Sequence, residues 1–205
     1  GKDPIKSTYL INKANFVACH MPAYVRKYNM VQDLKDGGTF LLNCAWDMED
    51  LEKNLPGQAK KYMYDHKINF YTIDGFKIGK EIGLGGRINT VLQSAFFKLA
   101  DIIPAEDAIK YMKDAATASY SKKGDYIVKM NHDAIDAGAT AFVKIEIPES
   151  WANAADEKLS ADVSGQRKDV VDYVNNIQNA INSQTGNQLP VSAFVDYVDG
   201  TLPMG

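Results

Sequence analysis

The chain has 205 residues, of which 45% are hydrophobic and 24% are charged, a balance typical of one globular domain with or without an appendage. The formal net charge of −3 gives no reason to expect nucleic acid or an anionic membrane as a partner. No stretch approaches the roughly 18 to 20 apolar residues of a membrane-spanning helix, and the first residues lack a signal-peptide pattern. We therefore expect a soluble chain.

The cysteines and histidines do not form a recognisable metal site. Cys19 and Cys44 have no CxxC spacing, and His20, His66 and His132 are scattered. This excludes a disulfide framework and an iron–sulfur site built from this chain alone. Each cysteine ends an expected strand, so it is either a small buried core residue or part of a ligand crevice at the carboxyl ends of the strands.

The first part of the chain alternates strands with helices. Residues 15–19 form a nearly continuous apolar run, typical of a strand covered on both faces. Residues 39–44 and 68–73 predict two further strands. Pro22 opens one helical stretch, and Asp47 can cap another. This alternation implies crossover connections, which build a parallel sheet.

The middle of the chain is predicted to be helical. A glycine-rich break at 83–86 precedes an apolar stripe over 88–99 with helical spacing. A second helix is expected from Pro104. A third follows Gly124 and stops near Gly138, a glycine suited to a helix C-terminus.

The last part changes in character. Residues 140–147 alternate apolar and polar side chains, as in a half-exposed strand near a sheet edge. We expect an open, mostly parallel α/β sheet with helices on both faces over 1–150. A polar helical segment at 151–188 would close the domain, and 189–205, with two prolines, would form an extended connector.

Two polar segments are candidates for contact with a phosphate-bearing ligand. The turn at 83–89 (GLGGRIN) could cradle a phosphate with its amides, although it matches neither common glycine-rich motif; the alternative is a hinge before a helix. Residues 1–9 carry two lysines and the aliphatic hydroxyls of Ser7 and Thr8, which suit phosphate oxygens; the alternative is a solvated strand. No Ser/His/Asp set, close carboxylate pair or Cys/His pair is visible, so the residues predict a domain without self-contained catalytic chemistry.

Six short stretches, in order along nearly the whole chain, carry a family resemblance. They are 2–11 (KDPIKSTYLI), 16–20 (FVACH), 37–44 (GGTFLLNC), 83–99 (GLGGRINTVLQSAFFKL), 191–194 (VSAF) and 199–201 (DGT). Together they resemble pyruvate:ferredoxin oxidoreductases. The chain is similar to domain III of that family, the γ-type domain, without its first strand and glycine-rich turn. The part after Val191 resembles the lead-in to the linker domain before the ferredoxin-like clusters.

The resemblance implies a part of an oxidoreductase that decarboxylates pyruvate to acetyl-CoA and CO2 while reducing ferredoxin or flavodoxin. It assigns thiamine diphosphate, Mg²⁺ and the 4Fe–4S clusters to other domains. This domain would position coenzyme A, supply no catalytic residue and no metal ligand, and be inactive alone. Carried over by position from the family, the candidates for contact with the phosphates of coenzyme A are Lys2, Lys6 and Ser7. Arg87 and Asn89 are weaker candidates.

The implied partners are other domains of the same polypeptide, coenzyme A, ferredoxin or flavodoxin through other domains, and a second copy of the parent enzyme, in the cytoplasm. One alternative is a non-catalytic scaffold that uses the helical face at 88–99 and the polar region at 152–188 for contacts. Another is a related enzyme with NADP as acceptor, a choice made beyond residue 205. Because an incomplete sheet exposes edge and apolar surface, we also expect self-association or a companion chain.

Overall fold

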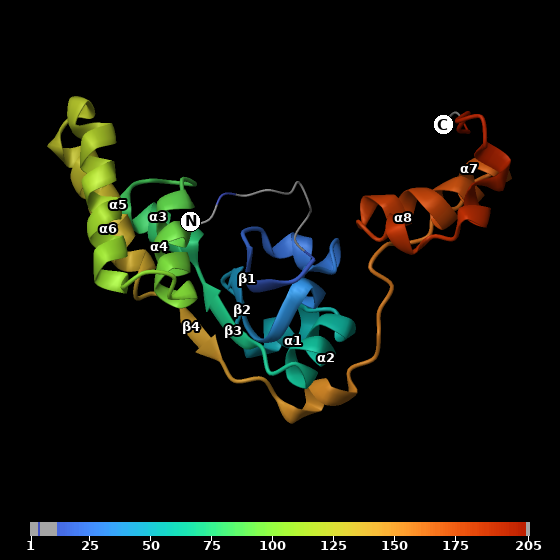
Figure 1. The fold of residues 1–205 in the computed structure, drawn as a ribbon, viewed down its shortest axis with the longest axis horizontal. Coiled ribbons are helices and arrows are strands. Elements are labelled where there is room, and N and C mark those ends of the chain that lie inside the picture. Colours follow the sequence, from blue (N-terminus) through green and yellow to red (C-terminus); the bar gives the residue numbers. More distant parts are fainter. Residues whose placement is uncertain (1–3, 5–11, 204–205) are drawn as a thin grey trace.

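In the computed structural model, Pro4 and residues 12–203 are described, and they form an open four-stranded sheet with the order β1-β2-β3-β4 (Figure 1). The first three strands are parallel, and β4 pairs antiparallel with β3. The expected open, mostly parallel sheet and its half-exposed edge strand are confirmed. The strands are β1 (Ala14–Cys19), β2 (Leu34–Asn43), β3 (Asn69–Ile73) and β4 (Val143–Ile145).

Two strand predictions need correction. β1 was expected to be covered on both faces, but it lies at the edge of the sheet, and only Cys19 is buried. β2 begins at Leu34, five residues earlier than expected, because Leu34 already pairs with Ala14 of β1 before an irregularity at Gly37. Gly37 has φ +69°, which favours glycine, and the pairing with β1 shifts its register at this point, between Ala14 and Phe16.

Helices cover both faces of the sheet, as predicted. Successive side chains of a strand point to opposite faces, so Phe40 and Leu42 pack against α1 and α2, whereas Leu41 packs beneath α4 and α6. The helices before the last quarter of the chain are α1 (Met48–Asn54), α2 (Gly57–Asp65), α3 (Gly75–Ile82), α4 (Asn89–Ala100), α5 (Ala105–Tyr120) and α6 (Asp125–Gly138).

Local sequence signals explain several helix ends. Asp47 caps α1, accepting a hydrogen bond from the Asp50 amide at 2.9 Å, as expected. Gly83 ends α3, a helix that the sequence did not predict, with φ +94°. α6 ends at Gly138 as predicted, but a left-handed C-terminal residue is not the reason. A Cβ there would lie 2.2 Å from the carbonyl oxygen of Val91, so glycine allows α6 to approach α4 closely.

Residues 148–158 cross the open side of the α1–α2 layer, and we call them the strap. Trp151 is fully buried against Phe70, with ring centroids 6.4 Å apart. Further along the strap, Glu157 accepts the amide of Gly57 at 3.1 Å and pairs with Arg26 at 2.5 Å. The strap therefore closes one face of the sheet with residues far away in sequence.

The region expected to be a polar helix, 151–188, is helical only in part. Residues 159–167 follow the strap without a helix, and a helical run then spans 168–182, formed by α7 (Lys168–Tyr173), a π-turn (Val174–Gln178) and α8 (Asn179–Asn182). Short 3-10 turns lie at Glu149–Asn153 and Gly186–Gln188. Residues Val191–Tyr197 form 3-10 turns, where an extended connector was expected. We call 168–203 the C-terminal body; in Figure 1 it lies away from the sheet, next to the turns at 22–33, with which it shares two polar cavities.

Among the residues described, no helix has the length and apolar character needed to cross a membrane.

Candidate functional site

A pocket of about 510 Å³ lies where the glycine-rich turn after α3 meets the start of α4 and the side of α6. We call it the loop pocket. Arg87 and Asn89, the two predicted site residues within the described part of the chain, both line it, and Lys123 in the turn before α6 is a second cation. The other lining residues are Gly83, Leu84, Gly85, Thr90, Tyr120, Ile127, Met130 and Asn131.

The glycine-rich turn is held by hydrogen bonds within its own backbone. The amides of Leu84 and Gly85 both donate to the carbonyl oxygen of Gly79, at 2.8 and 3.1 Å. The amides of Arg87 and Ile88 donate to carbonyl oxygens inside the turn, at 3.2 and 3.1 Å. Amides that are already bonded do not cradle a phosphate. These four amides are therefore taken up by the turn itself, which favours a hinge between two helices for residues 84–88.

The chemistry of the loop pocket lies in its side chains. No acidic residue lines it, and within residues 12–203 neither Arg87 nor Lys123 forms a salt bridge. The Nζ of Lys123 lies 5.4 Å from the ring centroid of Tyr120. A guanidinium presents a planar fork of donors that matches phosphate or carboxylate oxygens. These side chains suit an anionic ligand.

The stronger predicted site residues, Lys2, Lys6 and Ser7, lie outside the described residues. Their assignment to coenzyme A stays a prediction.

The carboxyl ends of the strands are joined by a residue that the sequence analysis overlooked. Asn43, at the end of β2, is 1% exposed. Its Nδ2 donates to the carbonyl oxygen of His20 at 2.9 Å, and its Oδ1 accepts the amide of Gly75 at 2.8 Å. An asparagine in an otherwise apolar strand was the available signal, because a buried amide needs such partners. Asn43 fixes the first turn of α3 to the sheet.

The two cysteines are core residues. Cys19 and Cys44 are 2% and 6% exposed, and both are free thiols. Burial raises the pKa of each thiol to about 11, so both stay protonated at neutral pH and are poor nucleophiles. In the part of the chain that the structure describes, no group of three or more His, Cys, Asp or Glu side chains is placed to hold a metal ion.

The fold and the site define a class of protein: an α/β domain with an open sheet and a pocket beside α4 that suits an anion. Many families share this architecture, so the family was identified by comparison with known proteins. The family model described as pyruvate ferredoxin/flavodoxin oxidoreductase matches residues 1–141. A second model, described as a domain of unknown function and named EKR, matches 161–205. The chain therefore belongs to the pyruvate ferredoxin/flavodoxin oxidoreductase family.

Curated relatives match along the whole chain. It is 44% identical over 205 residues to pyruvate:ferredoxin oxidoreductase of Moorella thermoacetica and 43% identical to pyruvate-flavodoxin oxidoreductase of Enterobacter agglomerans. It is 34% identical to the mitochondrial NADP⁺ pyruvate dehydrogenase of Euglena gracilis. The chain spans only 17%, 17% and 11% of the lengths of these three relatives.

One solved structure supports the fold. The pyruvate oxidoreductase subunit PORC of Thermotoga maritima superposes with a TM-score of 0.51, covering 66% of this chain and 67% of that one. The sequence identity is 16%, so this likeness concerns the fold alone.

Proposed function

We propose that this chain is one domain of a pyruvate:ferredoxin or pyruvate:flavodoxin oxidoreductase, and that it positions coenzyme A for the acetyl transfer. The observation that carries the proposal is the match of the entire chain, at 44% identity, to a segment of such an enzyme. The whole enzyme would decarboxylate pyruvate to acetyl-CoA and CO2 and pass electrons to its acceptor. The isolated chain would be inactive.

The candidates for coenzyme A are Lys2, Lys6 and Ser7, with Arg87 and Asn89 as weaker candidates. Lysine and serine donate hydrogen bonds to phosphate oxygens, and those from a charged donor are about twice as strong as neutral ones. The position of Arg87 in a pocket without acidic side chains supports a secondary role. These residues bind and orient the substrate, whereas the bond-making chemistry would belong to other domains.

We assign the redox and carbanion chemistry to those other domains. Thiamine diphosphate with Mg²⁺ and the 4Fe–4S clusters would lie there, as the resemblance to the family implies. The proposed partners are these domains, a second copy of the parent polypeptide, and ferredoxin or flavodoxin bound elsewhere. A cytoplasmic location is part of the same proposal.

The test uses the complete oxidoreductase. Changing Lys2 and Lys6 together to Ala removes two charged donors, and the KM for coenzyme A should rise roughly tenfold or more, with the KM for pyruvate unchanged. Lys53→Ala, an exposed lysine on α1, is the matched control and should leave both constants unchanged. An unaltered KM for coenzyme A in the double variant would remove the assignment.

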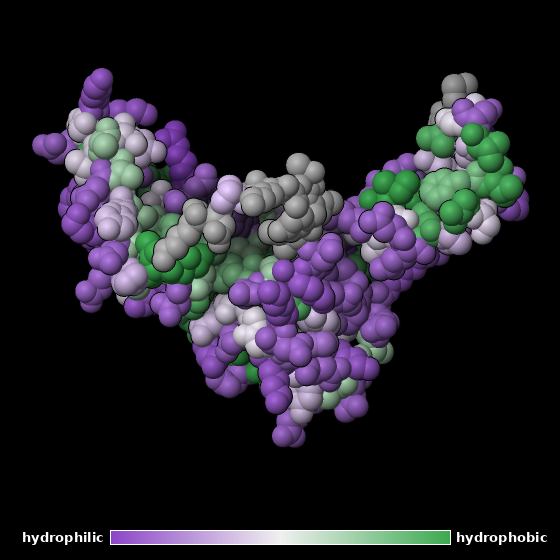
Figure 2. Space-filling view, in the orientation of Figure 1, coloured by the Kyte–Doolittle hydropathy of each residue, from purple (hydrophilic) through white to green (hydrophobic). Residues whose placement is uncertain are grey.

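A second function, that of a contact module, is favoured by the C-terminal body. Val191 and Val198 are 91% and 86% exposed, and Val195 is 65% exposed. Figure 2 shows hydrophobic side chains gathered on this body. Contiguous exposed apolar surface is typical of an interface, so these residues would pack against another part of the polypeptide. A titration with coenzyme A separates this from the first function, because a pure contact module binds none.

A further inference from the structure

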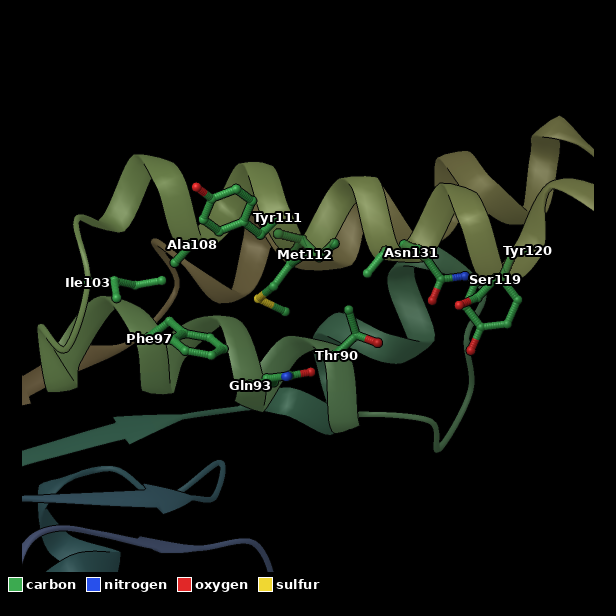
Figure 3. Close-up of a pocket in the computed structure, with 13 residues that line it drawn as sticks. Thr90, Gln93, Phe97, Ile103, Ala108, Tyr111, Met112, Ser119, Tyr120 and Asn131 are labelled. Atoms are coloured by element: carbon green, nitrogen blue, oxygen red, sulfur yellow. The ribbon is translucent and has the colours of Figure 1, made fainter. Parts of the chain in front are cut away.

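A second cavity, of about 420 Å³, adjoins the loop pocket. It lies between α4 and α5, and Figure 3 shows the side chains that face it from these helices. Thr90, Tyr120 and Asn131 line both cavities. The two are therefore neighbouring parts of one depression, and we call the second one the helix slot.

The helix slot is apolar over most of its length. Phe97 of α4 and Met112 of α5 project into it, with Ile103 at its far end (Figure 3). Ala108 and Ala115 contribute only methyl groups to the wall. The small alanine side chains of α5 leave room beside Phe97 of α4, so the slot remains open and is bordered mainly by carbon, with Gln93 and Tyr111 as polar residues in this part of the wall.

Most of the polar lining residues lie at the opposite end, where the slot meets the loop pocket; Gln93 lies between the two ends and Tyr111 near the apolar end (Figure 3). Arg87 and Lys123 supply two positive charges there. Asn131 is 6% exposed and donates from Nδ2 to the carbonyl oxygen of Ile127 at 2.8 Å. No Asp or Glu lines either cavity. One end thus favours an anion, and the other favours hydrocarbon.

We propose that the helix slot and the loop pocket together bind a small amphiphilic anion, of the class of medium-chain carboxylates. The head group lies at Arg87 and Lys123, and the hydrocarbon tail lies between α4 and α5. Both cavities fall within the range of about 300–1,000 Å³ that is usual for small-molecule sites, which combine an apolar wall with a few polar groups. The inference shares Arg87 with the coenzyme A proposal, but it does not need Lys2, Lys6 or Ser7, and Lys123 and the helix slot belong to it alone.

The experiment is a calorimetric titration of the 205-residue chain with decanoate. Decyltrimethylammonium, which has the same tail and the opposite charge, serves as the comparison ligand. We expect saturable binding of decanoate and at least tenfold weaker binding of the cation. Equal affinity for the two, or no saturable binding of decanoate by the folded chain, would overturn the proposal.

Paired variants locate the two ends of the site. Lys123→Gln should weaken decanoate binding roughly three- to tenfold, as loss of a partly exposed charged hydrogen bond does; the neighbouring Lys122→Gln lines neither cavity and should have no effect. Ala115→Leu should fill the slot and weaken binding, whereas Ala118→Leu, exposed on the same helix, should not. Both alanines are exposed, so neither change disturbs the core. If Lys123→Gln binds decanoate as tightly as Lys122→Gln, the assignment of the head-group end is wrong; if Ala115→Leu binds it as tightly as Ala118→Leu, the assignment of the tail end is wrong. If the complete oxidoreductase does not bind decanoate, the slot is an interdomain contact and not a ligand site.

Discussion

The two faces of the sheet are built differently. The face under α1 and α2 is closed by the strap, and Trp151, Leu51 and Met63 on that side are fully buried. The face under α4 and α6 is also packed next to the strands, with Val91 and Ala134 fully buried. Beyond that inner layer, however, lie the loop pocket and the helix slot.

The closed face relies on contacts between residues far apart in sequence. Trp151 and Glu52 bond across 99 positions, and Glu157 and Gly57 across 100. The open face is covered by helices close together in sequence: α6 touches α4 at Gly138, and the helix slot lies between α4 and α5. Both faces carry a buried core next to the strands, but only the outer layer of the α4–α6 side contains the loop pocket and the helix slot.

The largest effect should come from the closed face. Trp151→Ala removes a fully buried indole, and such a truncation costs about 3–5 kcal/mol, a large part of the stability of an ordinary domain. Urea unfolding measures the loss. Trp46→Ala, a half-buried tryptophan in the same layer, should cost clearly less. Equal losses would mean that the strap does not close this face.

The next effect concerns the close helix contact of the open face. In Gly138→Ala the new Cβ would meet the backbone of α4 at 2.2 Å, so α4 and α6 must separate. Overpacking of this kind costs about 1–3 kcal/mol, which exceeds the helix propensity gained. The melting temperature should fall. Gly86→Ala adds a methyl in open space without a positive φ and is the control; a Gly138 variant as stable as this one would contradict the close contact.

The smallest effect is electrostatic. The Glu52 carboxylate accepts hydrogen bonds from the indole N–H of Trp151 and, at 3.0 Å, from the ammonium of Lys60. Both hydrogen bonds lower the pKa of the Glu52 carboxyl below its usual 4.5, and the bond from Trp151 has the larger effect. A carboxyl whose pKa is lower in the folded than in the unfolded state stabilises the folded state at pH values above its unfolded pKa. That stabilisation is lost as the pH falls through the folded-state pKa. Because the side chain is 52% exposed, solvent screening keeps the contribution below about 1 kcal/mol.

Glu52→Gln tests this contribution. The variant should be slightly less stable than the parent at about pH 7, and the difference should shrink on acidification below about pH 4.5. Urea unfolding at several pH values measures it, with Glu81→Gln, an exposed glutamate of α3, as the control. If the stability difference between the parent and Glu52→Gln grows on acidification, the Glu52 carboxylate does not stabilise the fold in this way.

Sequence periodicity was sufficient for much of the fold. The stripe over 88–99 predicted α4, and Ile88, Val91 and Leu92 are buried as a helical repeat requires. Such patterns depend only on residues close together in the chain, so they can be recognised in a single sequence. The early start of β2 and the whole of α3 escaped, because glycines at 37 and 75 interrupt the apolar pattern where the fold needs close backbone approach or a positive φ.

The site could be predicted only in part. Arg87 and Asn89 were identified beside the glycine-rich turn, and both line the loop pocket. Lys123 was missed, since it joins them only when α6 packs back against α3 and α4. Likewise, the sequence around Trp151 and Glu157 does not predict the strap, because the residues that these two side chains contact lie about a hundred positions away.

The most direct test of the account is hydrogen–deuterium exchange of the complete oxidoreductase with and without coenzyme A. We predict slower exchange on binding at residues 1–9 and at the turn 83–90, which lines the loop pocket of the open face, and unchanged exchange across the strap at 148–158. Protection confined to the strap, or no change in this domain at all, would contradict the claim that the open face serves the ligand and the closed face serves stability.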